Sequence, residues 1–65
     1  MTVTPELKAF MDAVWTATSI SGNTVVDRRV ESGSLPDIQF TVELPNGEVD
    51  FVSAFDMFEN NVEFV

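Results

Sequence analysis

The sequence contains no cysteine and no histidine. Without cysteine the chain forms no disulfide, and without either residue it lacks the side chains that usually hold zinc. The commonest general bases and nucleophiles of enzymes are missing for the same reason. There is also no phosphate-binding glycine-rich loop and no calcium-binding loop. These absences predict a protein that is not an enzyme and that uses no cofactor or metal.

Basic residues are scarce, and none follows Arg29. The net charge is −8, and the acidic residues beyond Arg29 carry the whole excess: Glu31, Asp37, Glu43, Glu48, Asp50, Asp56, Glu59 and Glu63. Nucleic-acid binding needs basic side chains that neutralise phosphates, and anionic membrane surfaces repel an acidic protein. The charge therefore predicts that the protein binds neither nucleic acid nor membranes directly.

Long apolar runs are also absent. No run approaches the ~20 residues that span a bilayer, and the N-terminus "MTVTPELKAF" does not have the pattern of a signal peptide. We expect a cytoplasmic protein. Its 65 residues predict a single domain over residues 1–65, either a monomer or a small homo-oligomer. With six Phe and one Trp, apolar packing must supply the stability.

An amphipathic helix is predicted at the N-terminus. Thr4 is a suitable N-cap and Pro5 suits the first helical position. The apolar stripe that follows has helical spacing and comprises Leu7, Phe10, Met11, Val14 and Trp15. We expect the helix to cover residues 5–19 and Gly22 to end it.

Three strands and a short helix are predicted to follow. Residues 24–31 predict an edge strand because "DRR" interrupts its valines, and "SGSLPD" has the composition of a loop. Residues 38–44 alternate between apolar and polar side chains, and residues 49–52 predict their hairpin partner. Ser53 is the expected N-cap of a second helix of one or two turns, and "NNVEFV" could add a last strand. The predicted fold is α+β: an N-terminal helix packed on an antiparallel sheet of three or four strands, with a short second helix near the C-terminus.

The turn "PNG" allows two registers for this hairpin. Pro-Asn-Gly favours a type I turn with a glycine bulge, which pairs Leu44 with Glu48. That register places Glu48 and Asp50 on the buried face. Pairing Leu44 with Val49 through a loop over residues 45–48 keeps one face apolar instead. Because a slip of one residue inverts the two faces, we expect burial to select the second register.

In the expected register Glu43 lies opposite Asp50, an arrangement that destabilises a sheet. On a convex hairpin these two carboxylates would be solvated, so they do not predict an acid–base pair. Acidic residues also improve solubility, and that simpler explanation stays open. The absence of compensating bases favours a functional acidic surface. Its predicted partner-binding residues are Glu43, Glu48 and Asp50, flanked by Asp37, Asp56 and Glu59.

The density of charge suggests what such a surface does. A globule of this length is about 28 Å across, so its net charge amounts to about one per 3.5 Å. One strand of DNA carries one charge per ~3.4 Å of its axis. A surface of that density can occupy the basic groove that a nucleic-acid-binding protein keeps for its ligand, and long-range attraction would steer it there.

In its size, its lack of Cys and His, its N-terminal amphipathic helix and its acidic strands, the chain resembles the small anti-CRISPR and other DNA-mimic proteins of phages. The resemblance lies in character over the whole chain and in no motif. It implies an inhibitor in the cytosol of the host bacterium. Such an inhibitor binds a basic nucleic-acid-binding protein, a CRISPR effector complex above all, and blocks its access to DNA.

A second hypothesis is an ordinary protein-interaction module, such as an antitoxin, an immunity protein or a small subunit of an assembly. Its anchors would be the apolar residues of "FDMFENNVEFV", namely Phe55, Met57, Phe58, Val62 and Phe64. A small domain also needs such residues for its own core. Salt separates the two hypotheses, since acidic mimicry weakens with ionic strength and an apolar interface does not.

Overall fold

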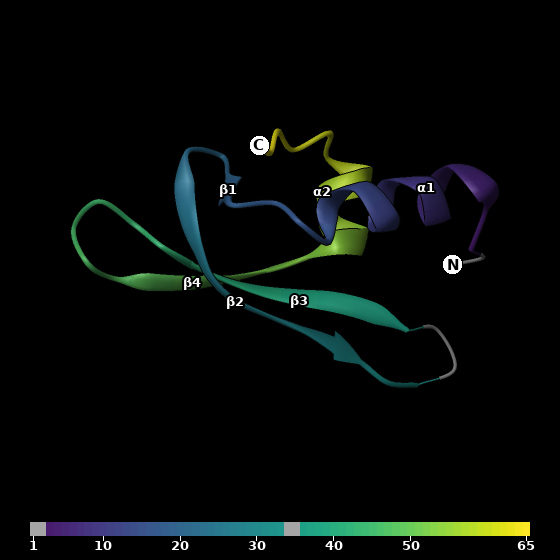
Figure 1. Ribbon diagram of the computed structural model, residues 1–65, viewed down its shortest axis with the longest axis horizontal. Coiled ribbons are helices and arrows are strands. Elements are labelled where there is room, and N and C mark those ends of the chain that lie inside the picture. The colour runs from purple at the N-terminus through teal and green to yellow at the C-terminus, as the bar shows by residue number, and fades with distance from the viewer. Residues whose placement is uncertain (1–2, 34–35) are drawn as a thin grey trace.

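A four-stranded antiparallel sheet carries two helices on one of its faces (Figure 1). The computed structural model describes residues 3–33 and 36–65. Its elements, in chain order, are α1 (Pro5–Val14), β1 (Ser19–Ile20), β2 (Asn23–Glu31), β3 (Asp37–Glu43), β4 (Val49–Ser53) and α2 (Ala54–Glu59). The strands lie in the order β1-β2-β3-β4. The predicted α+β class is confirmed.

Helix α1 begins as predicted and ends earlier. The Thr4 hydroxyl accepts the N–H of Leu7 at 3.1 Å, and Pro5 is the first helical residue. The helix ends at Val14 rather than near residue 19. The threonines and serines of "TATSIS" favour other conformations over a helix, and the end of this segment forms β1. The prediction for residues 15–19 was therefore wrong.

Gly22 has a different role from the one predicted. It lies in the two-residue turn between β1 and β2, where Ser21 has a φ of 50° and Gly22 a φ of 79°. Two successive residues with positive φ are typical of the tight turns that match the twist of a β-hairpin. Gly22 therefore reverses the chain between two strands and does not end α1.

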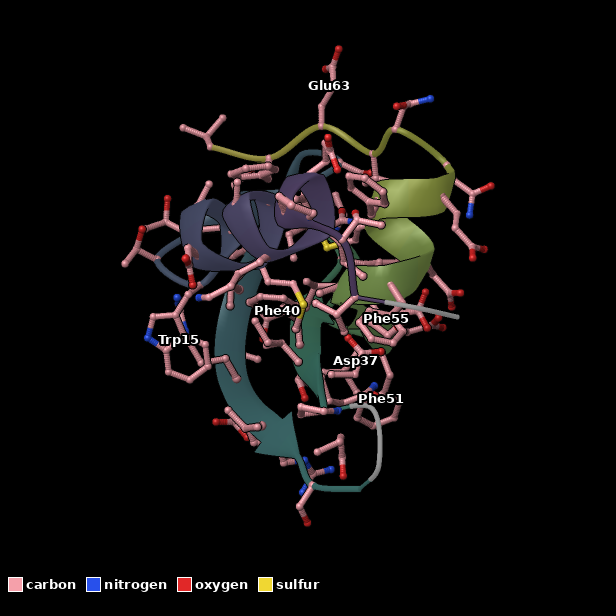
Figure 2. All side chains as sticks on the ribbon, turned by 90° about the vertical axis from the view of Figure 1, so that its right-hand side faces the viewer. Trp15, Asp37, Phe40, Phe51, Phe55 and Glu63 are labelled. Carbon is pink, nitrogen blue, oxygen red and sulfur yellow. The ribbon has the colours of Figure 1, made fainter. Side chains whose placement is uncertain are left out.

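The core lies between the helices and the sheet. Its buried side chains come from both layers and are Leu7, Val14, Ala17, Ile20, Ile38, Phe40, Val42, Ala54 and Met57. Phe40 is 0% exposed, whereas Trp15, which we expected in the core, is 40% exposed. Figure 2 shows Phe40 below the helices and Trp15 projecting from the side of the molecule. Trp15 is the C-cap residue of α1, and the buried residue at this end of the helix is Val14.

The β3–β4 hairpin adopts the register with the glycine bulge, so the predicted register was wrong. The N–H of Leu44 donates to the Glu48 carbonyl at 2.8 Å, and that of Gly47 donates to the Leu44 carbonyl at 2.9 Å. The Asn46 side chain accepts the N–H of Glu48 at 3.0 Å, and Gly47 has a φ of 86°. Turn chemistry at Asn46 and Gly47 therefore outweighs burial in setting the register.

This register exchanges the two faces of β4. Val42 pairs with Asp50 and Thr41 with Phe51. Since directly paired residues share a face, Phe51 lies on the face away from the helices and Asp50 on the face toward them. Asp50 remains exposed because the end of the hairpin extends beyond the helices (Figure 1). The polar side chain therefore keeps its contact with water.

The C-terminal segment lies beside β1. Phe64 forms an isolated antiparallel bridge with Ile20, and the N–H of Val65 donates to the Ser19 carbonyl at 3.0 Å. The expected last strand is thus reduced to a single bridge. Strand β1 in turn pairs with only the first two residues of β2. Among the described residues no helix is long and apolar enough to cross a membrane.

Candidate protein-binding surface

The six predicted binding residues form two separate groups. Glu43, Glu48 and Asp50 lie at the end of the β3–β4 hairpin, where all three are exposed. This end of the molecule lies farthest from the start of α1 in Figure 1. We call these three residues the hairpin carboxylates. They do not form a flat ladder, because Glu43 and Asp50 lie on opposite faces of the hairpin.

Asp37, Asp56 and Glu59 lie near the other end of β3, on or beside α2. Strand β3 has seven residues, which separates Asp37 from Glu43 by about 20 Å. Asp56 is in the first turn of α2, and Glu59 is its last residue. The predicted flanking charges therefore do not adjoin the hairpin carboxylates.

Asp37 has a structural role. Its side chain is half-buried, and its Oδ1 accepts the N–H of Ile38 at 2.7 Å and that of Phe55 at 3.2 Å. Two main-chain hydrogen bonds occupy this oxygen and join the start of β3 to the first turn of α2. A partner could not use this carboxylate fully without weakening the fold.

Glu43 and Asp50 do not repel each other across the sheet. Glu43 pairs with Val49, and Asp50 pairs with Val42, so the two carboxylates point to opposite faces. The predicted cross-strand repulsion was wrong, and it no longer argues for a functional surface. The position of the cations relative to the hairpin carboxylates supports a functional surface instead.

The cations of the chain are all engaged elsewhere. Lys8 pairs with Asp12 at 3.1 Å, and Arg29 pairs with Glu31 at 3.5 Å. Arg28 donates to the Trp15 carbonyl and lies 6.0 Å from the centre of the Phe40 ring. Within residues 3–33 and 36–65, no Lys or Arg comes within 4.0 Å of a hairpin carboxylate. The negative charge at this end of the molecule is uncompensated.

The sheet face away from the helices, here called the outer face, includes apolar residues that sequence reasoning placed in the core. Val49 is 56% exposed and Phe51 is 60% exposed. Glu43 lies beside Val49, and Asp27, which was not predicted as a binding residue, lies opposite Thr41 on the same face. The signal that could have revealed this face was the Asn-Gly turn, which sets the register.

Four of the five C-terminal apolar residues of the alternative hypothesis pack inside the protein. Met57 is fully buried. The rings of Phe58 and Phe64 lie edge-on against Phe10, with centroids 5.3 and 5.6 Å apart. The half-buried Val62 also packs against the core. These residues are therefore needed for folding, and the exposed apolar surface of the sheet is elsewhere.

A groove of about 230 Å³ lies beside α1, lined by Met11, Asp12, Trp15, Val30, Pro36, Asp37 and Ile38. Its two carboxylates are engaged, Asp12 with Lys8 and Asp37 with main-chain N–H groups. The lining is otherwise apolar and offers no nucleophile. Among the described residues, no three acidic side chains gather closely enough to hold a metal ion.

The chain was also compared with known proteins. Comparison with protein-family models, with curated proteins and with solved structures finds no match.

Proposed function

We propose that the protein is a non-enzymatic inhibitor that inserts its acidic hairpin into the basic groove of a nucleic-acid-binding protein. The observation that carries the proposal is the placement of the hairpin carboxylates. Glu43 and Asp50 lie on opposite faces of one protruding hairpin and Glu48 directly after its turn, and in the part of the chain that the structure describes none of the three has a cation beside it. A groove lined with Lys and Arg would meet a negative charge on every side of the hairpin.

The arrangement suits insertion better than flat docking. A partner that touched only one face of the sheet would reach Glu43 or Asp50 but not both. A cleft that closes around the hairpin reaches both and the turn between them. Clefts with basic walls also concentrate the electric field that steers an acidic ligand toward them. The class of partner that the resemblance implies, a CRISPR effector complex, holds its nucleic acid in a positively charged channel.

The test is competition with DNA. Purified CRISPR effector complexes are incubated with a fluorescent target duplex, and the displacement of the duplex by the protein is followed by anisotropy. We expect displacement that weakens as the salt concentration rises. The same titration is then repeated with a variant that carries Glu43→Lys, Glu48→Lys and Asp50→Lys together. This variant should lose inhibition by about a hundredfold or more.

A matched variant controls for the net charge. Glu6→Lys, Glu59→Lys and Glu63→Lys change the charge by the same amount at exposed positions away from the hairpin. Glu63 projects from the side of the molecule that carries the helices (Figure 2). We expect a loss of roughly tenfold or less for this variant, through the association rate. Equal losses for both variants, or inhibition that is indifferent to salt, would refute insertion of the hairpin.

A further inference from the structure

Strand β4 lies at one edge of the sheet. It is the last strand in the sheet order, and within residues 3–33 and 36–65 no strand pairs with its far side. The N–H of Leu44 donates to the Glu48 carbonyl, so Glu48 faces β3, and residues that face the partner strand alternate with residues that face away from it along an antiparallel ladder. The main-chain groups of Val49, Phe51 and Ser53 therefore point to the open edge.

One donor on this edge is occupied by a neighbouring side chain. The Oδ1 atom of Asp50 accepts the N–H of Phe51 at 2.8 Å. Charged side chains commonly protect the edges of sheets from pairing with another chain. Here the carboxylate that protects the edge is exposed. It can rotate away from the Phe51 N–H when a charged donor of another chain binds it. This contact therefore occupies one donor of an edge that is otherwise open.

The side chains along the edge alternate in character. Val49 and Phe51 place exposed apolar surface on the outer face, and Asp50, between them, points to the other face. A strand added at this edge would place its own residues beside these side chains in the same alternation. The edge therefore specifies apolar residues on one face of an added strand and a basic residue on the other.

We propose that β4 takes up an extended segment of the partner as an additional strand, and that this segment alternates apolar and basic residues. The inference rests on the proposed function, because it assigns the basic partner a binding mode. A second copy of this chain fits the edge poorly. Each copy carries a net charge of −8, and paired β4 edges would bring two sets of Glu48 and Asp50 close together.

Binding would proceed by an exchange of hydrogen bonds. A main-chain carbonyl of the added strand accepts the N–H of Phe51. The carboxylate of Asp50, released from that N–H, pairs with a Lys or Arg of the same strand. Addition of a strand to an open edge supplies main-chain hydrogen bonds for affinity, and alternate side chains supply specificity. Asp50 thus guards the free edge and recognises the incoming strand.

The test uses a synthetic peptide of about eight residues that alternates Val and Lys, a length within the usual range of strands. Two further versions are methylated on the main-chain nitrogens of the Val or of the Lys residues, and each blocks one edge of the extended peptide without changing its charge. Binding is measured from the amide signals of the ¹⁵N-labelled protein. We expect the unmodified peptide to shift the amide signals of Val49, Phe51 and Ser53. One of the two methylated versions should bind about tenfold more weakly than the unmodified peptide.

Variants of the protein test the same contact from the other side. Val49→Pro and Val49→Ala both remove the exposed side chain, but only proline removes a donor from the open edge. We expect Val49→Pro to bind about tenfold more weakly than Val49→Ala. Asp50→Asn keeps an oxygen that can accept the Phe51 N–H and removes the charge. It should weaken binding of the Val–Lys peptide and leave a matched Val–Ser peptide unaffected.

Several outcomes would overturn the added strand. Equal binding of all three peptides would mean that charge alone attracts them, and the acidic hairpin would stand as the inhibitory element. If Val49→Pro displaced DNA from the partner as strongly as Val49→Ala does, the acidic hairpin would likewise stand as the inhibitory element without an added strand. Dimerisation of the free protein through β4, detected by sedimentation and lost in Val49→Pro, would show that a second copy takes the edge. Failure to compete with DNA at all would refute the proposed function instead.

Discussion

The Asp37 carboxylate binds the main chain of a residue far along the sequence: its Oδ1 accepts the N–H of Phe55 at 3.2 Å. The same oxygen accepts the N–H of Ile38. These bonds join the start of β3 to α2. They therefore help to fix the orientation of the helix over the sheet. A residue predicted to bind a partner thus stabilises the fold.

Replacing Asp37 should therefore destabilise the protein. Asp37→Ala removes both hydrogen bonds and leaves two main-chain donors to find water, so we expect the free energy of unfolding to fall by about 1.5–3 kcal/mol. Asp37→Asn keeps an accepting oxygen and should cost less. Urea denaturation measures both. Glu63→Ala, at an exposed position, is the control and should change stability by less than about 0.5 kcal/mol. An Asp37→Ala variant as stable as this control would contradict the structural role.

Phe40 and Phe51 offer a matched test of the two sheet faces. Phe40 is fully buried, whereas Phe51 is 60% exposed. Phe40→Ala should cost about 3–5 kcal/mol, which approaches the whole stability of a domain of this size. Phe51→Ala should change stability by about 0.5 kcal/mol or less. Denaturation followed by circular dichroism compares them. If Phe51→Ala were the more damaging change, the register described above would be wrong.

Replacement of Gly47 should destabilise the β3–β4 hairpin. Its φ of 86° lies in the left-handed region, where a β-carbon costs about 1–2 kcal/mol. Gly47→Ala should therefore lower the Tm, by about 4–8 °C for each kcal/mol of stability that is lost. Gly33→Ala is the matched control, because an added β-carbon there meets nothing within 4 Å and no positive φ is required. Equal Tm values for the two variants would argue against the glycine bulge.

Salt should stabilise the free protein. Its net charge is −8, and the few cations are paired or engaged elsewhere, so the folded state carries unrelieved repulsion. Raising the ionic strength from about 0.01 M to about 1 M shortens the screening length from about 30 Å to about 3 Å. We expect the Tm in NaCl to rise over this range. A falling Tm would mean that the Lys8–Asp12 and Arg29–Glu31 pairs outweigh the repulsion.

Local signals in the sequence predicted the N-termini of both helices well. Thr4 and Ser53 each accept an N–H three residues ahead, as N-caps do. The alternation of residues 38–44 placed β3 correctly. These features depend on neighbouring residues alone, which is why a single sequence reveals them. The class of the fold followed from the same local patterns.

Features that depend on competition between local and distant interactions were predicted less well. Burial was expected to place Phe51 inside, but the preference of Asn46 and Gly47 for a tight turn decided the register. The apolar periodicity of α1 extended to Trp15, although the helix ends before it. For the candidate surface, the hairpin carboxylates were predicted as neighbours. Their distribution over two faces, and the exposed Val49 and Phe51 beside them, could not be foreseen without the correct register.

The three-residue loop of Pro45, Asn46 and Gly47 has a consequence for how such a surface can change. Because successive side chains of a strand point to opposite faces, one residue added to the loop or removed from it would turn β4 over. Phe51 would then face the helices, and Asp50 would face outward beside Glu43. The length of a single loop therefore selects which of two surfaces the same strand offers, without any substitution in the strand itself.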